Sequence, residues 1–156
     1  MWLINLVENL LAVTRIEEGR LNLRISEDLI DDVIAEALRH VNRKSVEHEI
    51  TVESEDEFLL AKMDAKLIVQ VVINIVDNAI KYTPKGSHIR IRTHMRDGRA
   101  VVSIADDGEG ISDETKPKIF DMFYSGANRV ADSRRSLGLG LSLCKSIINA
   151  HGGTIV

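Results

Sequence analysis

One short stretch of the sequence, residues 73–84 (INIVDNAIKYTP), places polar side chains inside an apolar run. Asn74 and Asn78 stand four residues apart, and Lys81 follows one turn later. Asparagine disfavours a helix by about 0.7 kcal/mol relative to alanine, so two of them in a core helix suggest a use for their side chains. Amide oxygens are hard ligands of the kind that Mg²⁺ takes, and a lysine suits phosphate. The stretch therefore indicates a site for a magnesium–phosphate group.

Residues 65–82 are expected to form the helix that positions these side chains, and residues 67–82 are placed on a helical wheel at about 100° per residue. One arc of this helix is polar: Gln70, Asn74, Asp77, Asn78 and Lys81. The opposite arc is apolar: Ile68, Val71, Val72, Ile75, Val76, Ala79 and Ile80. A polar arc is most often simply solvated, and the pattern alone leaves that reading open. Tyr82 falls at the edge of the arc, where it is placed to pack over a ligand.

Two glycine motifs follow. In DDGEGI (106–111), Gly108 and Gly110 allow a tight turn after a predicted strand, and the Asp106 carboxylate is placed to accept a hydrogen bond from an exocyclic amine. GLGL (138–141) begins an amphipathic helix, whose free N–H groups and positive dipole end favour phosphate. Each motif alone is weak, because DG turns and glycine-capped helices are common. The dinucleotide GxGxxG context and the P-loop GxxxxGK[ST] are both absent.

Periodicity predicts the elements that position these motifs. Helical spacing occurs at residues 3–16, 27–41 and 138–151, with Gly19 and Gly152 as stops. Strand-like patterns occur at residues 20–25, 48–54, 57–64, 85–96, 99–106 and 154–156, with an Asp97-Gly98 hairpin signal. The first helix has a stripe that suits either a partner helix or its own domain. The long, weakly patterned stretch after Asp106 is typical of a lid. Together the elements predict an α+β fold with helices covering one face of a mixed sheet.

Composition narrows the function classes. The chain has 156 residues, enough for one compact domain, and a formal net charge of −4. That charge argues against a nucleic-acid binder that relies on general positive charge. The single cysteine, Cys144, excludes an internal disulfide and gives no support for a zinc–thiolate cluster. No apolar run approaches a membrane span, and the start lacks a basic leader and carries Glu8, so neither a span nor a signal peptide is expected.

The order of the motifs is more specific than any one of them. An Asn-bearing helix, a strand ending in DxGxG, then IFDMFY, GLGL on a helix and HGG follow one another from about residue 60 to the end. This order closely resembles the catalytic and ATP-binding domain of sensor histidine kinases. Residues 5–23 resemble the last stretch of the dimerisation helices that precede that domain. The segment DSRRSLGLGLSLCKSIINAHGG is most similar to potassium-responsive members of the family.

The resemblance implies an α+β fold in which three helices cover one face of a mixed, mostly antiparallel sheet. This two-layer α/β sandwich is the Bergerat fold shared with gyrase, Hsp90 and MutL ATPases. Residues 1–20 are then expected to be the C-terminal end of the dimerisation and phosphoacceptor helices. Residues 21–156 are expected to be the catalytic domain, ending before its last strands.

The resemblance also implies a set of nucleotide-binding residues drawn from all the motifs. They are Asn74, Asn78, Lys81, Tyr82, Asp106, Gly108, Gly110, Ile111, Phe120, Phe123, Arg135, Leu137, Gly138, Leu139, Gly140 and Leu141. Asn78 would be the Mg²⁺ ligand, with Asn74 and Lys81 beside it as the catalytic residues. Asp106 would read the adenine amino group. The two lid phenylalanines would anchor the lid, and the glycines of GLGL would present N–H groups to the phosphates.

Asn74 bears on the chemistry that follows binding. ATPases of the superfamily carry a glutamate at the corresponding position, where it activates water, and an amide cannot act as a general base. Asn74 therefore favours handing the γ-phosphate to another group over hydrolysing it. One departure concerns the lid: Ser136 and Leu137 stand where the family's second glycine box has Gly-Thr.

The expected activity is that of a protein-histidine kinase whose cofactors are ATP and Mg²⁺. The acceptor histidine is expected outside this chain, because none of His40, His48, His88, His94 and His151 lies in the family's acceptor motif. Expected partners are the phosphoacceptor domain of the same protein, a response regulator and a second copy, with no nucleic acid. The chain would be a cytoplasmic domain of a bacterial sensor that is membrane-anchored only through segments outside it. An anti-sigma-type serine kinase and a non-catalytic nucleotide-binding module remain as alternatives.

Overall fold

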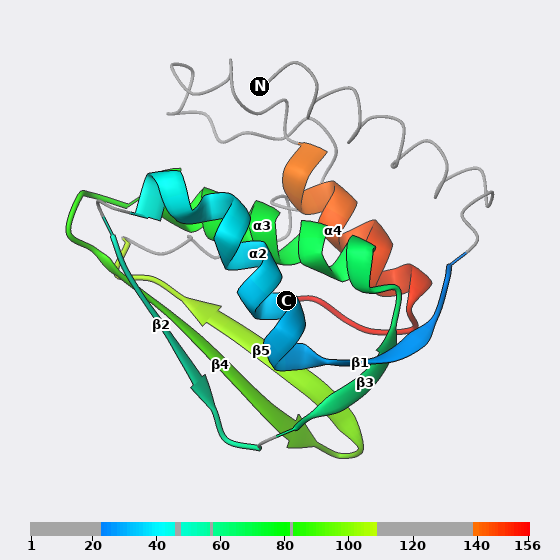
Figure 1. Cartoon of the computed structure of the whole chain (residues 1–156). Coiled ribbons are helices and arrows are strands. Elements are labelled where there is room, and N and C mark those ends of the chain that lie inside the picture. The colour runs from blue at the N-terminus through cyan, green and yellow to red at the C-terminus, as the bar shows by residue number, and fades with distance from the viewer. Residues whose placement is uncertain (1–22, 46–47, 57, 82, 109–138) are drawn as a thin grey trace. The chain divides into compact units, whose positions relative to one another are not determined.

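The computed structural model describes residues 23–45, 48–56, 58–81, 83–108 and 139–156. The chain forms two compact units, Arg24–Gly110 and Met1–Leu23 with Ile111–Val156. The described elements of the first unit are β1 (Ser26–Leu29), α2 (Ile30–Ser45), β2 (Glu49–Ser54), β3 (Leu60–Met63), α3 (Ala65–Lys81), β4 (His88–Arg96) and β5 (Arg99–Ala105) (Figure 1). The second unit contributes α4 (Leu139–Ala150).

The main sheet has three strands with β4 at its centre. β2 lies parallel to β4, and β5 lies antiparallel to β4 on the other side. Parallel neighbours need a long crossover, usually a helix, and α3 lies in the connection between β2 and β4. The predicted hairpin is confirmed, because Asp97 and Gly98 join β4 to β5 with φ angles of 51° and 75°. Positive φ at both central residues suits the type I′ turn of a two-residue hairpin.

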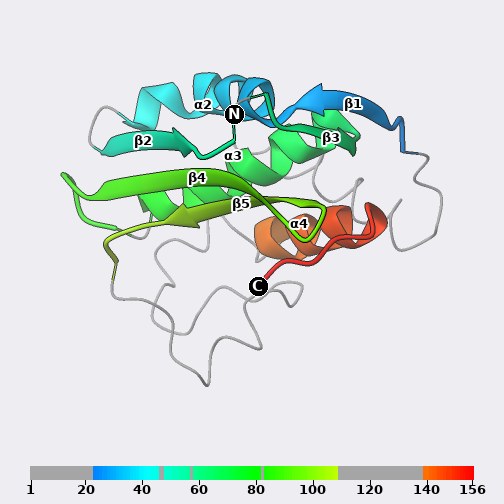
Figure 2. The ribbon, with the colours of Figure 1, turned by 90° about the horizontal axis from the view of Figure 1, so that it is seen from below.

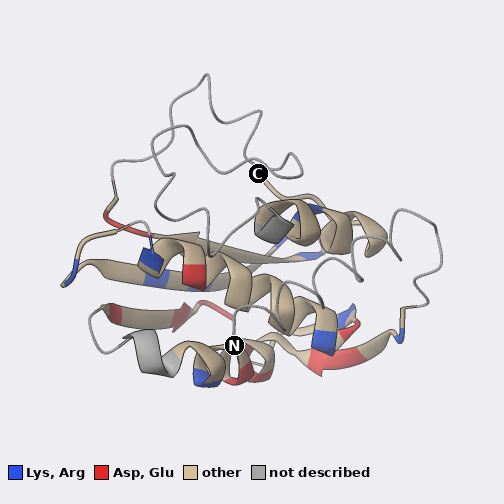
Figure 3. Cartoon of the chain, turned by 90° about the horizontal axis from the view of Figure 1, so that it is seen from above, with Lys and Arg blue, Asp and Glu red and all other residues tan. Residues whose placement is uncertain are grey.

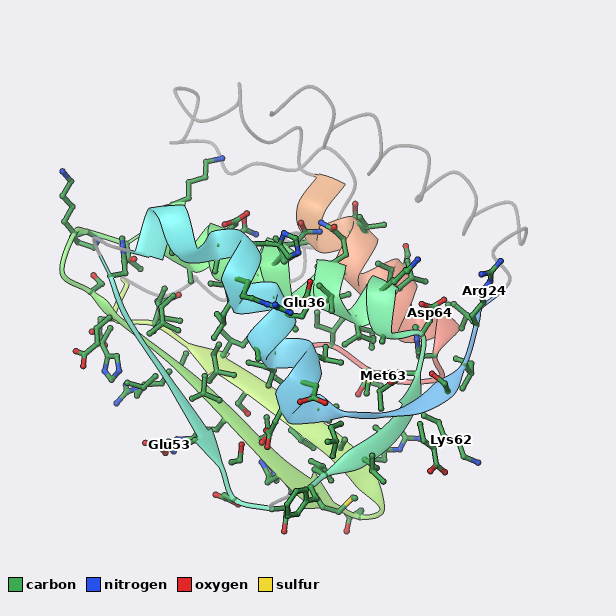
Figure 4. All side chains as sticks on the ribbon, viewed as in Figure 1. Arg24, Glu36, Glu53, Lys62, Met63 and Asp64 are labelled. Carbon is green, nitrogen blue, oxygen red and sulfur yellow. The ribbon has the colours of Figure 1, made fainter. Side chains whose placement is uncertain are left out.

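A smaller sheet fixes the starts of the two helices. β1 pairs antiparallel with β3, with Ser26 opposite Met63. The Arg24 N–H donates to the Asp64 carboxylate at 3.0 Å, and the two residues lie beside one another in Figure 4. The Asp64 carbonyl then accepts the N–H groups of Leu67 and Ile68, which begins α3. The start of α3 is thereby tied to Arg24, which precedes β1 and lies 40 residues before Asp64 in the sequence.

The core of the first unit lies between the helices and the main sheet. α2 and α3 lie on one face of that sheet (Figure 1), and from the sheet side β4 lies in front of α3 (Figure 2). Both helices and the strands β2, β3, β4 and β5 contribute side chains to the main core cluster or pack side chains against it. The buried members of the cluster are Ile30, Val33, Ile34, Ala37, Val41, Leu59, Met63, Val72, Val76 and Ile91. The apolar arc predicted for α3 is confirmed, since Val71, Val72, Val76 and Ala79 are buried. Charged residues are sparse along α3, whereas α2 carries both signs (Figure 3).

Three of the predicted boundaries are wrong. Residues 23–25 of the predicted strand 20–25 are not in a strand, and the strand forms at Ser26–Leu29, where β3 offers a partner. The helix predicted from residue 27 therefore begins at Ile30. Residues 154–156 form no strand and pair with no described strand. Alternation of apolar and polar residues predicts which side chains share a face of a strand. It does not predict which neighbouring strand supplies the hydrogen bonds of the ladder.

The other predicted elements agree with the structure where it describes them. The strands around residues 48–54 and 57–64 form but pair with different partners, β4 and β1, and not with each other. The predicted helix at residues 3–16 lies outside the described residues. No helix in the described ranges is long and apolar enough to cross a membrane.

α4 belongs to the second unit and ends in a well-formed cap. Gly152 has φ 75°, and its N–H donates to the Asn149 carbonyl at 3.0 Å. The Gly153 N–H donates to the Ile148 carbonyl at 3.0 Å, which completes a Schellman motif. The prediction of Gly152 as the helix stop is confirmed. His151 bonds the Ile147 carbonyl through Nδ1 at 2.7 Å, so this histidine closes a helix end.

Thr93 gives a test of how the main sheet packs. Its side chain is completely buried in β4, and its hydroxyl has no hydrogen-bond partner. A buried hydroxyl without a partner is destabilising by about 1–3 kcal/mol. We expect Thr93→Val, which keeps the shape and the β-branching, to raise the free energy of unfolding by about 1 kcal/mol in urea denaturation.

The matched control is Thr51→Val in the neighbouring strand. The Thr51 hydroxyl is paired with His88 Nε2 at 2.8 Å, so its removal is expected to leave stability unchanged or lower it. A loss of stability in Thr93→Val equal to that in Thr51→Val would show that the Thr93 hydroxyl has a partner in solution.

Candidate functional site

The topology of the first unit brings the end of α3 to the end of β5. The last turn of α3 leads through residues 82–87 into the start of β4. β5 runs antiparallel to β4, so Ala105 at its end lies opposite Arg90 near the start of β4. The residues that follow the helix and those that follow β5 therefore meet at the same end of the sheet. The predicted asparagine helix and the predicted DxGxG turn share this location.

Of the two polar side-chain atoms of Asn74, one is hydrogen-bonded and the other is not. Its Oδ1 accepts the amide N–H of Gln70 at 3.0 Å, one turn earlier in α3. Its Nδ2 is buried and has no hydrogen-bond partner. The amide therefore offers a donor, which suits an anionic oxygen such as that of a phosphate. Gln70 fixes the Asn74 side chain in this orientation. The sequence placed both residues on the polar arc but did not predict this hydrogen bond.

The turn after β5 is held by two carboxylates. The Gly108 N–H donates to Asp106 Oδ1 at 2.8 Å, which fixes that carboxylate next to the turn. The His88 N–H donates to Asp107 Oδ2 at 2.8 Å and ties the turn to the start of β4. Arg90 lies 4.0 Å from the other Asp107 oxygen, and both side chains are about half exposed, so this ion pair contributes little. Asp106 itself is exposed.

Close packing leaves little room for a side chain at Gly108. A Cβ at this position would lie 2.9 Å from Asp106 Oδ1 and 3.2 Å from the Thr83 methyl carbon. The first distance is shorter than real Cβ contacts allow, so any side chain here would displace the carboxylate. The second distance shows that Thr83, just after α3, lies against the turn that follows β5. This contact joins the two predicted motifs directly.

Two residues support Thr83 through hydrogen bonds that were not predicted from the sequence. Its hydroxyl donates to the Ala79 carbonyl at 2.6 Å and also meets His48 Nε2 at 2.8 Å. His48 precedes β2 and lies 35 residues before Thr83. Nothing in the sequence marks this pairing, because histidine before a strand has no fixed role. Asp107 was likewise passed over, although its position beside Asp106 is visible in the sequence.

The second glycine motif lies in the other unit. α4 begins at Leu139, so Gly140 and Leu141 fall in its first turn, as predicted for GLGL. The remaining predicted site residues lie outside the described residues: Tyr82, Gly110, Ile111, Phe120, Phe123, Arg135, Leu137 and Gly138. Leu139 and Gly140 are placed only as helical backbone. The described part of the site in the first unit thus consists of Asn74, Asn78, Lys81, Asp106 and Gly108.

The residues present fit a hard cation that also binds phosphate. No cluster of three His, Cys, Asp or Glu side chains occurs in the described ranges, so a metal fully caged by such ligands is not supported there. Asn78 lies one turn after Asn74 and contributes an amide oxygen to the same polar arc. In proteins Mg²⁺ is held mainly by substrate phosphates and water, with one or two protein oxygens. The Asn78 oxygen, with the Asn74 N–H₂ group as a hydrogen-bond donor to phosphate, fits this pattern.

Two surface hollows, each of about 370 Å³, lie elsewhere. One is lined by side chains of the main sheet that include Arg90, Arg92 and His94, and the other lies along α2 and the start of α3. Neither touches the predicted site residues. Arg92 in the first hollow is paired with Glu53 at 3.2 Å.

Comparison with known proteins identifies the family. The histidine kinase-, DNA gyrase B- and HSP90-like ATPase family matches residues 63–156. The chain belongs to this ATPase family. It is 42% identical over 154 residues to the sensor protein KdpD of Clostridium acetobutylicum, covering 99% of this chain and 17% of that protein. The chain thus spans about a sixth of the length of this relative.

Solved structures agree with the predicted fold class. The catalytic domain of histidine kinase ThkA superposes on this ATPase domain with a TM-score of 0.72 and 29% identity, covering 83% of this chain and 84% of that one. ThkA in complex with the response regulator TrrA gives a TM-score of 0.73 and 28% identity, covering 96% of this chain and 42% of that one. The prediction of a histidine kinase catalytic fold is confirmed.

Gly108 provides a test of the geometry of the ATPase domain's site. We expect Gly108→Ala to weaken ATP binding by about tenfold in isothermal titration calorimetry, because the added Cβ displaces Asp106 and a hydrogen bond to a charged group contributes about 1.5–3 kcal/mol. The unfolding free energy should change little in comparison.

Gly98→Ala is the matched control at the opposite end of β5. Gly98 has φ 75° and open space around it, so alanine there is strained and should lower stability without changing ATP affinity. Equal ATP affinities of Gly108→Ala and the unaltered domain would contradict the close approach of Gly108 to Asp106.

Proposed function

We propose that this domain binds Mg·ATP and transfers the γ-phosphoryl group to a histidine outside the chain, as part of a two-component sensor kinase. The observation that carries the proposal is the orientation of Asn74. Its oxygen is engaged by Gln70 and its N–H₂ is unpaired and buried, so position 74 offers a donor and no base. A site that binds phosphate but lacks a base to activate water favours transfer over hydrolysis.

The described residues divide the work of binding. Asp106 accepts a hydrogen bond from the adenine amino group, and Gly108 lets the base approach the backbone of the turn. The Asn74 amide donates to a phosphate oxygen, and Lys81 balances phosphate charge from the last turn of α3. Asn78 holds Mg²⁺ through its amide oxygen. When bound, Mg²⁺ neutralises charge on the phosphates during transfer.

Transfer breaks the bond between the γ-phosphorus and the oxygen that bridges it to the β-phosphate. A new bond forms from phosphorus to an imidazole nitrogen of the acceptor, and ADP leaves. The acceptor nitrogen must be unprotonated to attack, and a base beside the acceptor histidine supplies this condition. The domain's own residues contribute position and charge, which carry most of the catalysis in phosphoryl transfer.

The relatives support a wider setting for the domain. Residues 1–20 are assigned to the end of the dimerisation and phosphoacceptor helices, and residues 21–156 to the catalytic domain. The partners are that phosphoacceptor region, a second copy of the sensor and a response regulator; ThkA has been solved with such a regulator. The identity of 42% to KdpD supports potassium or osmotic sensing by a membrane-anchored protein whose catalytic domain is cytoplasmic.

The site assignment is tested by two charge changes. We expect Asn78→Asp and Asp106→Asn to abolish Mg·ATP binding or weaken it at least tenfold in calorimetry. The first adds a negative charge beside the phosphates, and the second replaces the acceptor for the adenine amine by an amide. Asp32→Asn, which removes one charge from an exposed position on α2, is the control and should bind normally. Unchanged affinity in both site variants would refute the assignment.

The absence of a base at position 74 is tested by restoring one. We expect Asn74→Glu to raise the rate of ATP hydrolysis at least tenfold, because a positioned general base contributes about 10²–10⁴ in rate and Gln70 can orient the new carboxylate. Phosphate release is measured at saturating ATP. Asn74→Gln, which lengthens the side chain without adding a base, is the control and should stay at the basal rate. Equal rates in the two variants would remove the argument that Asn74 directs phosphate away from water.

A further inference from the structure

His48 is a buried histidine that none of the nucleotide-binding motifs includes. It lies just before β2, in the first unit, and is 8% exposed. Its Nε2 lies 2.8 Å from Thr83 Oγ1, and its Nδ1 is buried without a hydrogen-bond partner. The ring therefore makes one side-chain hydrogen bond, and that bond goes to the residue that borders the base-binding turn.

The direction of this hydrogen bond follows from the hydroxyl. Thr83 Oγ1 donates its only proton to the Ala79 carbonyl at 2.6 Å. Toward His48 it is left as an acceptor, so His48 Nε2 carries the hydrogen and donates it. The two bonds together fix the rotation of the Thr83 side chain. With the hydroxyl held on one side, the methyl group is held on the other.

The Thr83 methyl is the part that reaches the turn. It lies 3.2 Å from the position that a Cβ of Gly108 would take. Gly108 in turn donates its N–H to Asp106 Oδ1 at 2.8 Å. Two hydrogen bonds and this close approach thus link His48 through Thr83 and Gly108 to the Asp106 carboxylate. All four residues belong to the Arg24–Gly110 unit.

We propose that His48 is a positioning residue for the base-binding turn and acts through Thr83. This inference rests on the proposed function, in which Asp106 accepts a hydrogen bond from the adenine amino group. His48 touches no part of the nucleotide. It sets the orientation of Thr83, the Thr83 methyl sets the position of Gly108, and Gly108 holds Asp106. The consequence is selectivity for a purine that carries a 6-amino group.

The test compares two nucleotides that differ only in that amino group. ATP and purine riboside triphosphate, which lacks the 6-amino group, are titrated into the full chain with Mg²⁺. A misplaced Asp106 lowers the affinity for ATP alone, whereas partial unfolding lowers both affinities equally. The dissociation constant of purine riboside triphosphate divided by that of ATP is the ratio that separates a positioning role from a merely structural one.

We expect His48→Leu to reduce this ratio about three- to tenfold, the range that follows from weakening one hydrogen bond. Thr83→Val, which keeps the methyl and removes the hydroxyl, should give a similar reduction and serves if His48→Leu does not fold. His48→Gln places an N–H near the position of Nε2 and should restore most of the ratio. Ser54→Ala is the control, because it breaks a side-chain hydrogen bond of 2.7 Å to Asp31, and neither residue is bonded to the turn; it should leave the ratio unchanged.

Asp106→Ala, which removes the acceptor, is measured in the same way and separates the two proposals. If Asp106→Ala leaves the ratio unchanged, Asp106 does not read the amine and the proposed function is wrong at this residue. If Asp106→Ala collapses the ratio while His48→Leu and Thr83→Val do not, the positioning role of His48 is overturned and the proposed function stands. Equal losses for both nucleotides in the His48 and Thr83 variants would also overturn it.

Discussion

The parallel pairing of β2 with β4 is the constraint on which the candidate site depends. Two parallel neighbours cannot be joined by a tight turn, so the chain must leave the sheet and return across it. The return path contains α3, whose apolar arc packs over the sheet. The antiparallel return of β5 then delivers Asp106 to the end of the sheet where α3 finishes. Helix and turn are thus neighbours in space although 24 residues or more separate them in sequence.

At that end of the sheet, short polar contacts fix groups that would otherwise move. Asp107 bonds the first backbone N–H of β4, and Asp106 accepts the N–H of Gly108. Thr83 bonds both the end of α3 and His48. Each bond alone contributes about 0.5–1.5 kcal/mol to stability, but their common effect is geometric. Groups held before the ligand arrives lose less conformational freedom when it binds.

The sequence predicted those parts of the fold that local chemistry determines. The helix of α3, the Asp97-Gly98 hairpin and the Gly152 stop each depend on residues within a few positions of one another, and all three are confirmed. Strand boundaries were less predictable, because β1 forms where β3 can pair with it and residues 154–156 have no described partner. The His48–Thr83 bond could not be predicted, since it joins residues 35 positions apart and neither residue type is special. The nucleotide-binding residues came from the order of motifs, and Gln70 and Asp107 became visible only through their hydrogen bonds.

The buried, unpaired amide nitrogen of Asn74 makes the ligand-free domain less stable than a variant with an apolar side chain at this position would be. A buried donor without a partner is destabilising by about 1–3 kcal/mol, and an apolar side chain at position 74 would remove that cost. The native residue keeps an unpaired donor, and under the proposed function a phosphate oxygen that reaches it gains more than it would from a solvated amide. Stability and affinity therefore oppose each other at this position. A search for more stable variants of the domain would select against the asparagine, and a search for tighter nucleotide binding would keep it.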